Sequence, residues 1–252
     1  MKTGRINSIQ SLGTVDGPGV RFTVFLQGCC LRCSCCHNPD TWDISEGKEY
    51  TSDEIIGKAL RYREYFGKDG GLTFSGGEPL LQADFVCEVF KMCRDNGINT
   101  CLDTAGPVFS NKISELLQYT DRVLLDIKYT NEKQYLEHVG CSMSKPLSFL
   151  DHLESHNIHT TIRHVVIPTV NDEDASIVKI CEIATAHKCV DSIELLPFHR
   201  MCSVKYDNLG IPFPFSDIPE PSPESMEHFE SLISDFYIIR NKTVNERSVN
   251  HK

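Results

Sequence analysis

Six short apolar, β-branched segments, separated by stretches with helical periodicity, limit what this chain can fold into. That alternation is the pattern of a parallel sheet whose strands are joined by crossover helices. Several segments are apolar at nearly every position, as strands buried on both faces should be. The expected strands are Arg21 to Gly28, Gly71 to Ser75, Asn99 to Thr104, Arg122 to Lys128, His159 to Ile167 and Ser192 to Phe198.

Helices are expected between the strands. The clearest begins at Thr51, where Thr51 and Glu54 have the spacing of a capping box, and runs to about Tyr65. The others are Gln82 to Asp95, Ser110 to Gln118, Lys145 to His156, Asp174 to His187 and Pro223 to Phe236. Six βα units are too few for an eight-fold barrel, so the sequence predicts an open, partial (β/α)6 barrel. A doubly wound sheet is the alternative.

The composition is that of an ordinary globular protein of 252 residues, 40% hydrophobic and 24% charged. No linker or repeat divides it, so one domain is expected over residues 1–240, followed by a polar, disordered tail at residues 241–252. There is no apolar targeting segment and no membrane-length run, which predicts a cytoplasmic protein. The formal charge of −10 argues against nucleic acid or an anionic membrane as the main partner.

Five of the twelve cysteines lie between positions 29 and 36, too close together to form disulfides without strain, which indicates a reducing compartment. Three of them, Cys29, Cys33 and Cys36, form a C-x3-C-x2-C array directly after the first expected strand. A cubane cluster has four irons, so three thiolates leave one iron open to a small chelating molecule. The array therefore predicts an open [4Fe–4S] site.

The cysteines alone leave two alternatives open. Cys30, Cys33 and Cys36 also form a C-x2-C-x2-C run like that of a ferredoxin, although Asp40 stands where the fourth cysteine would be. A structural zinc site needs a second ligand pair, and no second C-x2-C follows, although His37 could complete one tetrahedron.

Polar motifs lie at the C-terminal ends of the expected strands, where parallel α/β proteins place their chemistry. If the barrel is correct, these motifs converge on one mouth. They are Ser75-Gly76-Gly77-Glu78, Asp103-Thr104, Asp126-Ile127-Lys128, Arg163 on the fifth strand, and His199 after the sixth.

Each motif has more than one interpretation. Asp126 and Lys128 share one face of a strand end and would suit the ammonium and carboxylate of an amino acid, but they can also form a solvated ion pair. Arg163 needs a partner, which can be an anionic ligand or a structural carboxylate. Asp103 can cap a helix, and two glycines after a strand can be a tight turn.

Together these residues resemble the radical S-adenosylmethionine (SAM) enzymes and, within them, the activating enzymes of glycyl-radical enzymes. The resemblance covers roughly the first 240 residues. It is carried by Gly13 to Gly19, Gln27 to Cys29, Cys36 to Asn38, Asp40 to Asp43, Cys101 to Thr104, Leu125 to Lys128 and Ile193 to His199.

The resemblance implies a cluster on Cys29, Cys33 and Cys36 whose open iron binds SAM. One electron would cleave SAM to a 5′-deoxyadenosyl radical, which takes a hydrogen from a glycine of a partner protein. The expected partner is pyruvate formate-lyase, with another glycyl-radical enzyme as the alternative. A metal-binding electron-transfer module is the alternative of a different class. Flavodoxin or ferredoxin is the expected electron donor, and the chain is expected to be a monomer.

The resemblance also implies roles for individual residues. A monovalent cation would lie at Asp103, Thr104 and Asp126, and Asp16 would face the substrate loop. The chain departs from the family at Cys35, where an aromatic residue is usual. The residues expected to hold SAM are Gly77, Asp126, Ile127, Lys128 and His199, with Cys35, Cys36 and His37 from the loop and Arg163 near the carboxylate.

Overall fold

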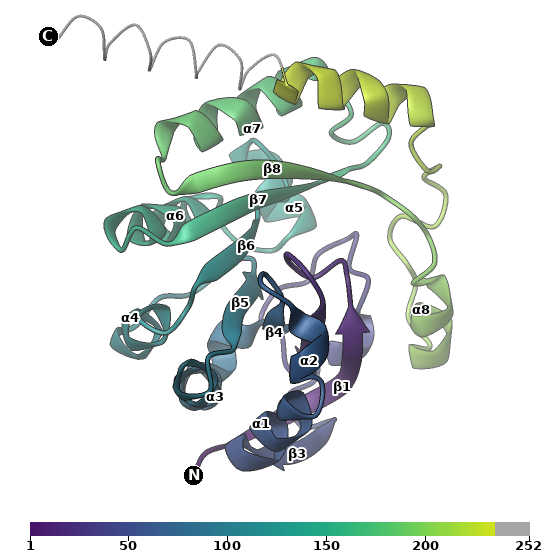
Figure 1. Cartoon of the computed structure of the whole chain (residues 1–252). Helices are drawn as coiled ribbons and strands as arrows, with labels where there is room; N and C mark the ends of the chain where they lie inside the picture. The colour runs from purple at the N-terminus through teal and green to yellow at the C-terminus, as the bar shows by residue number, and fades with distance from the viewer. Residues whose placement is uncertain (235–252) are drawn as a thin grey trace, which may run out of the picture.

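The computed structural model describes residues 1–234, and Figure 1 shows their arrangement. The predicted tail at residues 241–252 and the end of the predicted last helix lie outside the described residues. Within residues 1–234, no helix is both long and apolar enough to cross a membrane.

One open sheet of eight strands forms the centre, in the order β3-β1-β2-β4-β5-β6-β7-β8. The last six strands in this order, β2-β4-β5-β6-β7-β8, pair in parallel with their neighbours. Each of the six overlaps one of the predicted strands. Because the order ends at β3 and β8, the six-strand barrel is partial, as predicted. The six are β2 (Arg21–Leu26), β4 (Gly71–Gly76), β5 (Asn99–Thr104), β6 (Arg122–Asp126), β7 (His159–Val166) and β8 (Val190–Pro197).

Two antiparallel strands of the sheet were not predicted from the sequence. β1 (Thr3–Gly13) pairs with β2, and β3 (Lys48–Thr51) pairs with the first residues of β1. The apolar residues of β1 (Ile6, Ile9 and Leu12) recur every three residues, so they lack the two-residue alternation that marks a half-buried strand.

The crossover helices lie on the outer side of the curved sheet, while α8 lies apart from them (Figure 1). Residues 223–234 are also helical, and Pro39–Thr41 (η1) and Pro79–Gln82 (η2) form single 3-10 turns. The helices are α1 (Ser52–Leu60), α2 (Arg63–Phe66), α3 (Ala83–Asp95), α4 (Asn111–Leu117), α5 (Glu132–His138), α6 (Ser144–Ser155), α7 (Asp174–Ala186) and α8 (Ser203–Leu209).

The predicted capping box is confirmed at the start of α1. The Glu54 amide donates to the Thr51 hydroxyl (3.2 Å), and the Thr51 amide donates to the Glu54 carboxylate (2.8 Å). The predicted end at Tyr65 is wrong, because α1 ends at Leu60. The next amides, of Arg61 and Tyr62, bond back only three residues, which tightens the last turn.

A fully buried arginine joins the strands at the end of the barrel opposite the cysteines. Arg21 begins β2, and its Nε donates to the Thr73 hydroxyl (2.9 Å). Its Nη1 donates to the Asn99 side-chain oxygen (2.8 Å), and its Nη2 donates to the Leu72 carbonyl (2.8 Å). Since these acceptors lie on β4 and β5, one side chain links three neighbouring strands.

Candidate functional site

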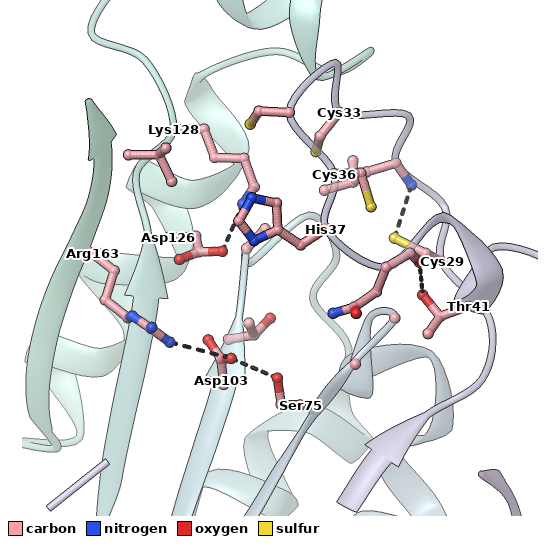
Figure 2. Close-up of a pocket in the computed structure, with 18 of the residues that line it drawn as sticks. Cys29, Cys33, Cys36, His37, Thr41, Ser75, Asp103, Asp126, Lys128 and Arg163 are labelled. Atoms are coloured by element: carbon pink, nitrogen blue, oxygen red, sulfur yellow. Dashed lines mark hydrogen bonds and ion pairs between the residues drawn. The ribbon is translucent and has the colours of Figure 1, made fainter. Parts of the chain in front are cut away.

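A cavity of about 470 Å³ lies at the C-terminal ends of the parallel strands (Figure 2). Its wall is formed by the loop after β2, by Val15 and Asp16 in the turn before β2, and by residues at or near the ends of the other five parallel strands. The structure therefore brings together nearly every residue that the sequence predicted for the site. The predicted residues that line the cavity are Asp16, Cys29, Cys33, Cys35, Cys36, His37, Gly77, Asp103, Thr104, Asp126, Lys128, Arg163 and His199.

Ile127 is the predicted residue whose side chain does not line the cavity. Its side chain is fully buried in the core, because alternate residues of an extended segment face opposite sides and Asp126 and Lys128 take the cavity side. Its carbonyl instead accepts a hydrogen bond from Nδ1 of the buried His164 (2.7 Å). Ile127 thereby helps to fix the strand end that carries its two neighbours.

The three thiols of the C-x3-C-x2-C array face one cavity, as a cluster with one open iron requires. The Cys36 amide donates to the Cys33 carbonyl (3.1 Å), and the Leu31 amide donates to Cys29 Sγ (3.4 Å). Burial raises the pKa of Cys29 to about 12 and also raises the pKa of Cys33 and Cys36. The thiolates therefore need a bound cation for stability, which a metal cluster supplies. The three thiols therefore fit a [4Fe–4S] cluster.

The loop is held from outside by α8, which the sequence analysis missed. The Tyr206 hydroxyl donates to the Cys36 carbonyl (3.2 Å), and the Tyr206 ring meets Trp42 edge-on with ring centres 6.0 Å apart. Lys205 Nζ donates to the side chains of Asn38 (2.8 Å) and Asp40 (3.0 Å). The C-terminal half of the loop thus depends on residues far along the chain.

The glycine after β4, Gly77, allows two backbone segments to touch. A Cβ on Gly77 would lie 2.2 Å from the Gly28 carbonyl oxygen, so no larger residue fits without movement. The Gly77 amide donates to the Leu26 carbonyl (2.9 Å), and the Glu78 amide donates to the Gly28 carbonyl (2.8 Å). The close approach fixes Glu78 beside the root of the cysteine loop.

Glu78 is a cavity residue that the sequence analysis did not select. Its carboxylate is buried and accepts from the Thr104 hydroxyl (2.6 Å) and from the amides of Leu80 (3.0 Å) and Ala105 (3.1 Å). Burial raises its pKa to about 7 in spite of these donors. The signal in the sequence was a carboxylate directly after two glycines at a strand end, a position suited to a cationic ligand.

The raised pKa of Glu78 predicts a pH dependence of stability. Between pH 4.5 and about 7 the folded protein holds a proton on Glu78 that the unfolded chain has released. Raising the pH through this window should therefore lower the free energy of unfolding of the ligand-free protein, by up to about 1.4 kcal/mol per pH unit from this group. Urea titrations at half-unit pH intervals measure the slope.

The matched variant is Glu78→Gln, which cannot ionise and should give a flatter profile over the same window. A cationic ligand that pairs with the carboxylate should reverse the trend, since it lowers the pKa of Glu78 and binds better as the pH rises. Parallel profiles for the wild type and Glu78→Gln would contradict the assignment.

Charged side chains on the opposite wall form ion pairs. Lys128 Nζ lies 2.7 Å from the Asp126 carboxylate, which raises the lysine's pKa against the opposing effect of burial. Arg163 lies 3.5 Å from Asp103 and 3.2 Å from Glu194, and the Ser75 hydroxyl donates to Asp103 (2.6 Å; Figure 2). Arg163 thus has two carboxylate partners while it also lines the cavity, and its contact with a ligand carboxylate stays a prediction.

The predicted cation site consists of two carboxylates and one hydroxyl. Burial raises the pKa of Asp103 to about 6, while Arg163 opposes the shift. The Thr104 hydroxyl already donates to Glu78. Among residues 1–234, no three His, Cys, Asp or Glu side chains are grouped to hold a single metal ion. The monovalent-cation site, which has only two carboxylates, stays a prediction.

Two histidines pack against each other beside the cysteines. The ring centres of His37 and His199 lie 4.1 Å apart. Burial, helped by His199, lowers the pKa of His37 to about 4, so this ring is neutral at physiological pH. His199 Nδ1 is buried and has no hydrogen-bond partner within residues 1–234. This unused ring nitrogen is available to a polar ligand.

Asp16 and Cys35 also face the cavity. Asp16 is buried, accepts from the Thr23 hydroxyl (3.2 Å), and has its pKa raised by burial. Cys35 is buried, and burial raises its pKa to about 11. Cys30, by contrast, is exposed. All twelve cysteines lie within the described residues and are free thiols.

Comparisons with known proteins agree with this geometry. Residues 23–181 match the radical SAM superfamily. The pyruvate formate-lyase-activating enzyme of Clostridium pasteurianum is 42% identical over 236 residues, covering 93% of this chain and 99% of that protein. The pyruvate formate-lyase 1-activating enzyme of Escherichia coli (strain K12) is 41% identical, covering 92% of this chain and 96% of that protein.

Solved structures agree on the fold. A domain of a pyruvate-formate lyase-activating enzyme from Bacteroides vulgatus superposes with a TM-score of 0.56 at 23% identity, covering 66% of this chain and 94% of that one. Streptococcus suis SuiB, bound to its precursor peptide SuiA, gives a TM-score of 0.68 at 13% identity, covering 92% of this chain and 48% of SuiB. The chain belongs to the radical SAM superfamily and, within it, to the family of the pyruvate formate-lyase-activating enzymes.

Proposed function

We propose that this chain activates pyruvate formate-lyase by generating a glycyl radical on it. The observation that carries the proposal is that Cys29, Cys33 and Cys36 face the same cavity as Glu78 and the Asp126–Lys128 pair. Three thiols with a neighbouring set of opposite charges fit a cluster that shares its open iron with a zwitterionic ligand. The names of the relatives support the choice of partner.

The [4Fe–4S] cluster, when bound, would supply the electron that cleaves SAM to the 5′-deoxyadenosyl radical, and this radical would take a hydrogen atom from a glycine of the partner protein. The protein's own side chains would bind and orient the reactants. The carboxylates of Glu78 and Asp126 can hold the SAM ammonium, while Lys128 can exchange its partner Asp126 for the SAM carboxylate. The neutral His37 and the unpartnered Nδ1 of His199 can contact the nucleoside.

The substrate loop would enter where the cavity meets solvent beside Asp16. Val15 lines the cavity, yet 65% of its surface is exposed, so the wall reaches the exterior there. Pro197, at the end of β8, lines the cavity and is also exposed. Because β8 ends the sheet, an extended segment of a partner can approach between β8 and the Asp16 turn. Asp16 would face that segment.

The remaining predictions complete the proposal. Flavodoxin or ferredoxin would deliver the electron, because cluster reduction needs a one-electron donor of low potential. The protein would act as a monomer in the cytoplasm. A monovalent cation at Asp103, Thr104 and Asp126 would offset the two carboxylates.

Anaerobic mixing with candidate partners tests the proposal. The reconstituted, reduced protein should convert SAM to 5′-deoxyadenosine and methionine and produce the paramagnetic resonance signal of a glycyl radical on pyruvate formate-lyase. A Gly→Ala change at the partner's radical site should remove the signal and leave SAM cleavage intact.

The same experiment separates the alternatives. A signal on another glycyl-radical enzyme, with none on pyruvate formate-lyase, would reassign the partner. Stoichiometric zinc, or a cluster that transfers electrons without forming 5′-deoxyadenosine, would contradict the proposal altogether.

A further inference from the structure

Gln27 stands between β2 and the cysteine loop, and none of the roles described so far involves it. Its side chain is 1% exposed. Its backbone amide donates to the Arg5 carbonyl (2.9 Å), and its own carbonyl accepts from Gln82 Nε2 (2.8 Å). The backbone of Gln27 is thus fixed to β1 and to η2 before the loop begins.

The side-chain amide of Gln27 binds the far end of the same loop. Nε2 donates to the carbonyls of Asp40 (2.9 Å) and Asp43 (2.8 Å), while Oε1 accepts from Asn7 Nδ2 (3.1 Å). Carbonyl oxygens only accept, so the amide can take only this orientation. Both N–H groups are used, and the group is buried. Its loss would leave the Asp40 carbonyl without a donor and the Asp43 carbonyl with only the Glu46 amide (3.2 Å).

Two backbone bonds close the loop beside Gln27. The Gly28 amide donates to the Thr41 carbonyl (2.7 Å), and the Cys29 amide donates to the Trp42 carbonyl (3.3 Å). These bonds place Cys29 against the segment that ends the loop. They are retained only while that segment stays next to β2. The Gln27 side chain holds the segment from the β2 side, and Lys205 of α8 holds Asp40 from the other end of the chain.

We propose that Gln27 is a positioning residue for the cluster. By joining the two ends of the loop at residues 28–43, it preorganises the three thiols for cluster binding. The inference rests on the assignment of the cluster to this loop and is independent of the partner protein. Groups that hold metal ligands in place commonly change metal affinity by about 10- to 100-fold when replaced.

Gln27→Met keeps the length of the side chain and removes every hydrogen bond of the amide. In the cluster-free protein, hydrogen exchange should accelerate at the amides of Gly28 and Cys29, because their acceptors lie on the released segment. In the reconstituted protein, iron loss to a chelator under anaerobic conditions should be about 10-fold faster than in the wild type.

Three variants serve as comparisons. Gln82→Met removes an amide that donates to Arg5 and Gln27 but makes no bond with residues 40–43, so it should lower the melting temperature without faster iron loss. Gln27→Glu should be as damaging as Gln27→Met, since a carboxylate would face two carbonyl oxygens. Asn7→Ala leaves Gln27 in place but frees its Oε1, so its effect should be intermediate.

The proposal would be overturned if Gln27→Met left the hydrogen-exchange rates of the Gly28 and Cys29 amides unchanged. It would also be overturned if Gln27→Met and Gln82→Met lost iron to the chelator at equal rates. If Gln27→Met does not fold, Asn7→Ala tests the proposal instead. Iron loss faster than in the wild type is expected, and iron loss at the wild-type rate would contradict the proposal. If the wild type itself binds no cluster, the proposed function fails. The exchange experiment on cluster-free protein then still tests whether Gln27 holds the loop.

Discussion

Cys29→Ala is expected to leave the protein without a stable [4Fe–4S] cluster and without SAM cleavage, and Cys33→Ala and Cys36→Ala should do the same. These three thiols face one cavity, and each would supply the sole protein ligand of one iron. Removing one leaves two ligands for four irons. Iron and sulfide content, cluster absorption after anaerobic reconstitution, and 5′-deoxyadenosine formation measure the loss.

Cys30→Ala and Cys35→Ala are the matched controls from the same loop. Cys30 is exposed and lies outside the cavity wall, so its variant should keep the cluster. Cys35 lines the cavity but lies outside the C-x3-C-x2-C spacing, so its variant should also keep the iron. Loss of iron from Cys30→Ala together with its retention in Cys29→Ala would show that the ligand assignment is wrong.

Arg21→Met is expected to cause the largest loss of stability among single changes outside the site. The buried guanidinium donates to the Thr73 hydroxyl, the half-buried Asn99 side chain and the Leu72 carbonyl, and methionine would remove all three of these hydrogen bonds. With roughly 1 kcal/mol or more for each, the free energy of unfolding should fall by about 3 kcal/mol. The melting temperature of the cluster-free protein should fall by roughly 6–12 °C.

Arg122→Met is the control, because Arg122 also joins neighbouring strands but is partly exposed. Its Nη2 lies 2.9 Å from Asp191, and its side chain is 24% exposed. The expected cost is about 1 kcal/mol or less. Arg21→Lys keeps the charge but not the fork of donors and should remain close to Arg21→Met. Equal melting temperatures for Arg21→Met and Arg122→Met would contradict this role of the buried arginine.

The six parallel strands could be predicted because short β-branched and apolar segments alternate with helical stretches, and several of these segments are apolar enough to be buried on both faces. The site followed from that pattern, since the ends of parallel strands meet at one edge and Asp103, Asp126 and Lys128 stand at those ends. Side chains alternate along a strand end, so the pattern that places Asp126 and Lys128 on the cavity side places the Ile127 side chain in the core.

What the sequence did not reveal depends on contacts between distant residues. Gln27 and Tyr206 show no local pattern, and their importance is visible only from the carbonyls that they bond. The helices α5 and α8 were also missed. The equally short α4 was predicted, because its apolar Ile113, Leu116 and Leu117 have helical spacing. Glu78 is the exception, because its position after two glycines at a strand end was visible and was not used.

The contacts between α8 and the cysteine loop determine when, during synthesis of the chain, the loop can be complete. Lys205 bonds Asp40 and Asn38, which precede it by 165 and 167 residues, and Tyr206 bonds Cys36, 170 residues earlier. A nascent chain that has emerged only as far as β7 carries all three cysteines of the C-x3-C-x2-C array but none of these contacts. Long-range contacts form only after their intervening loop has closed. The cluster therefore finds its complete binding loop only in a chain whose synthesis has passed residue 206.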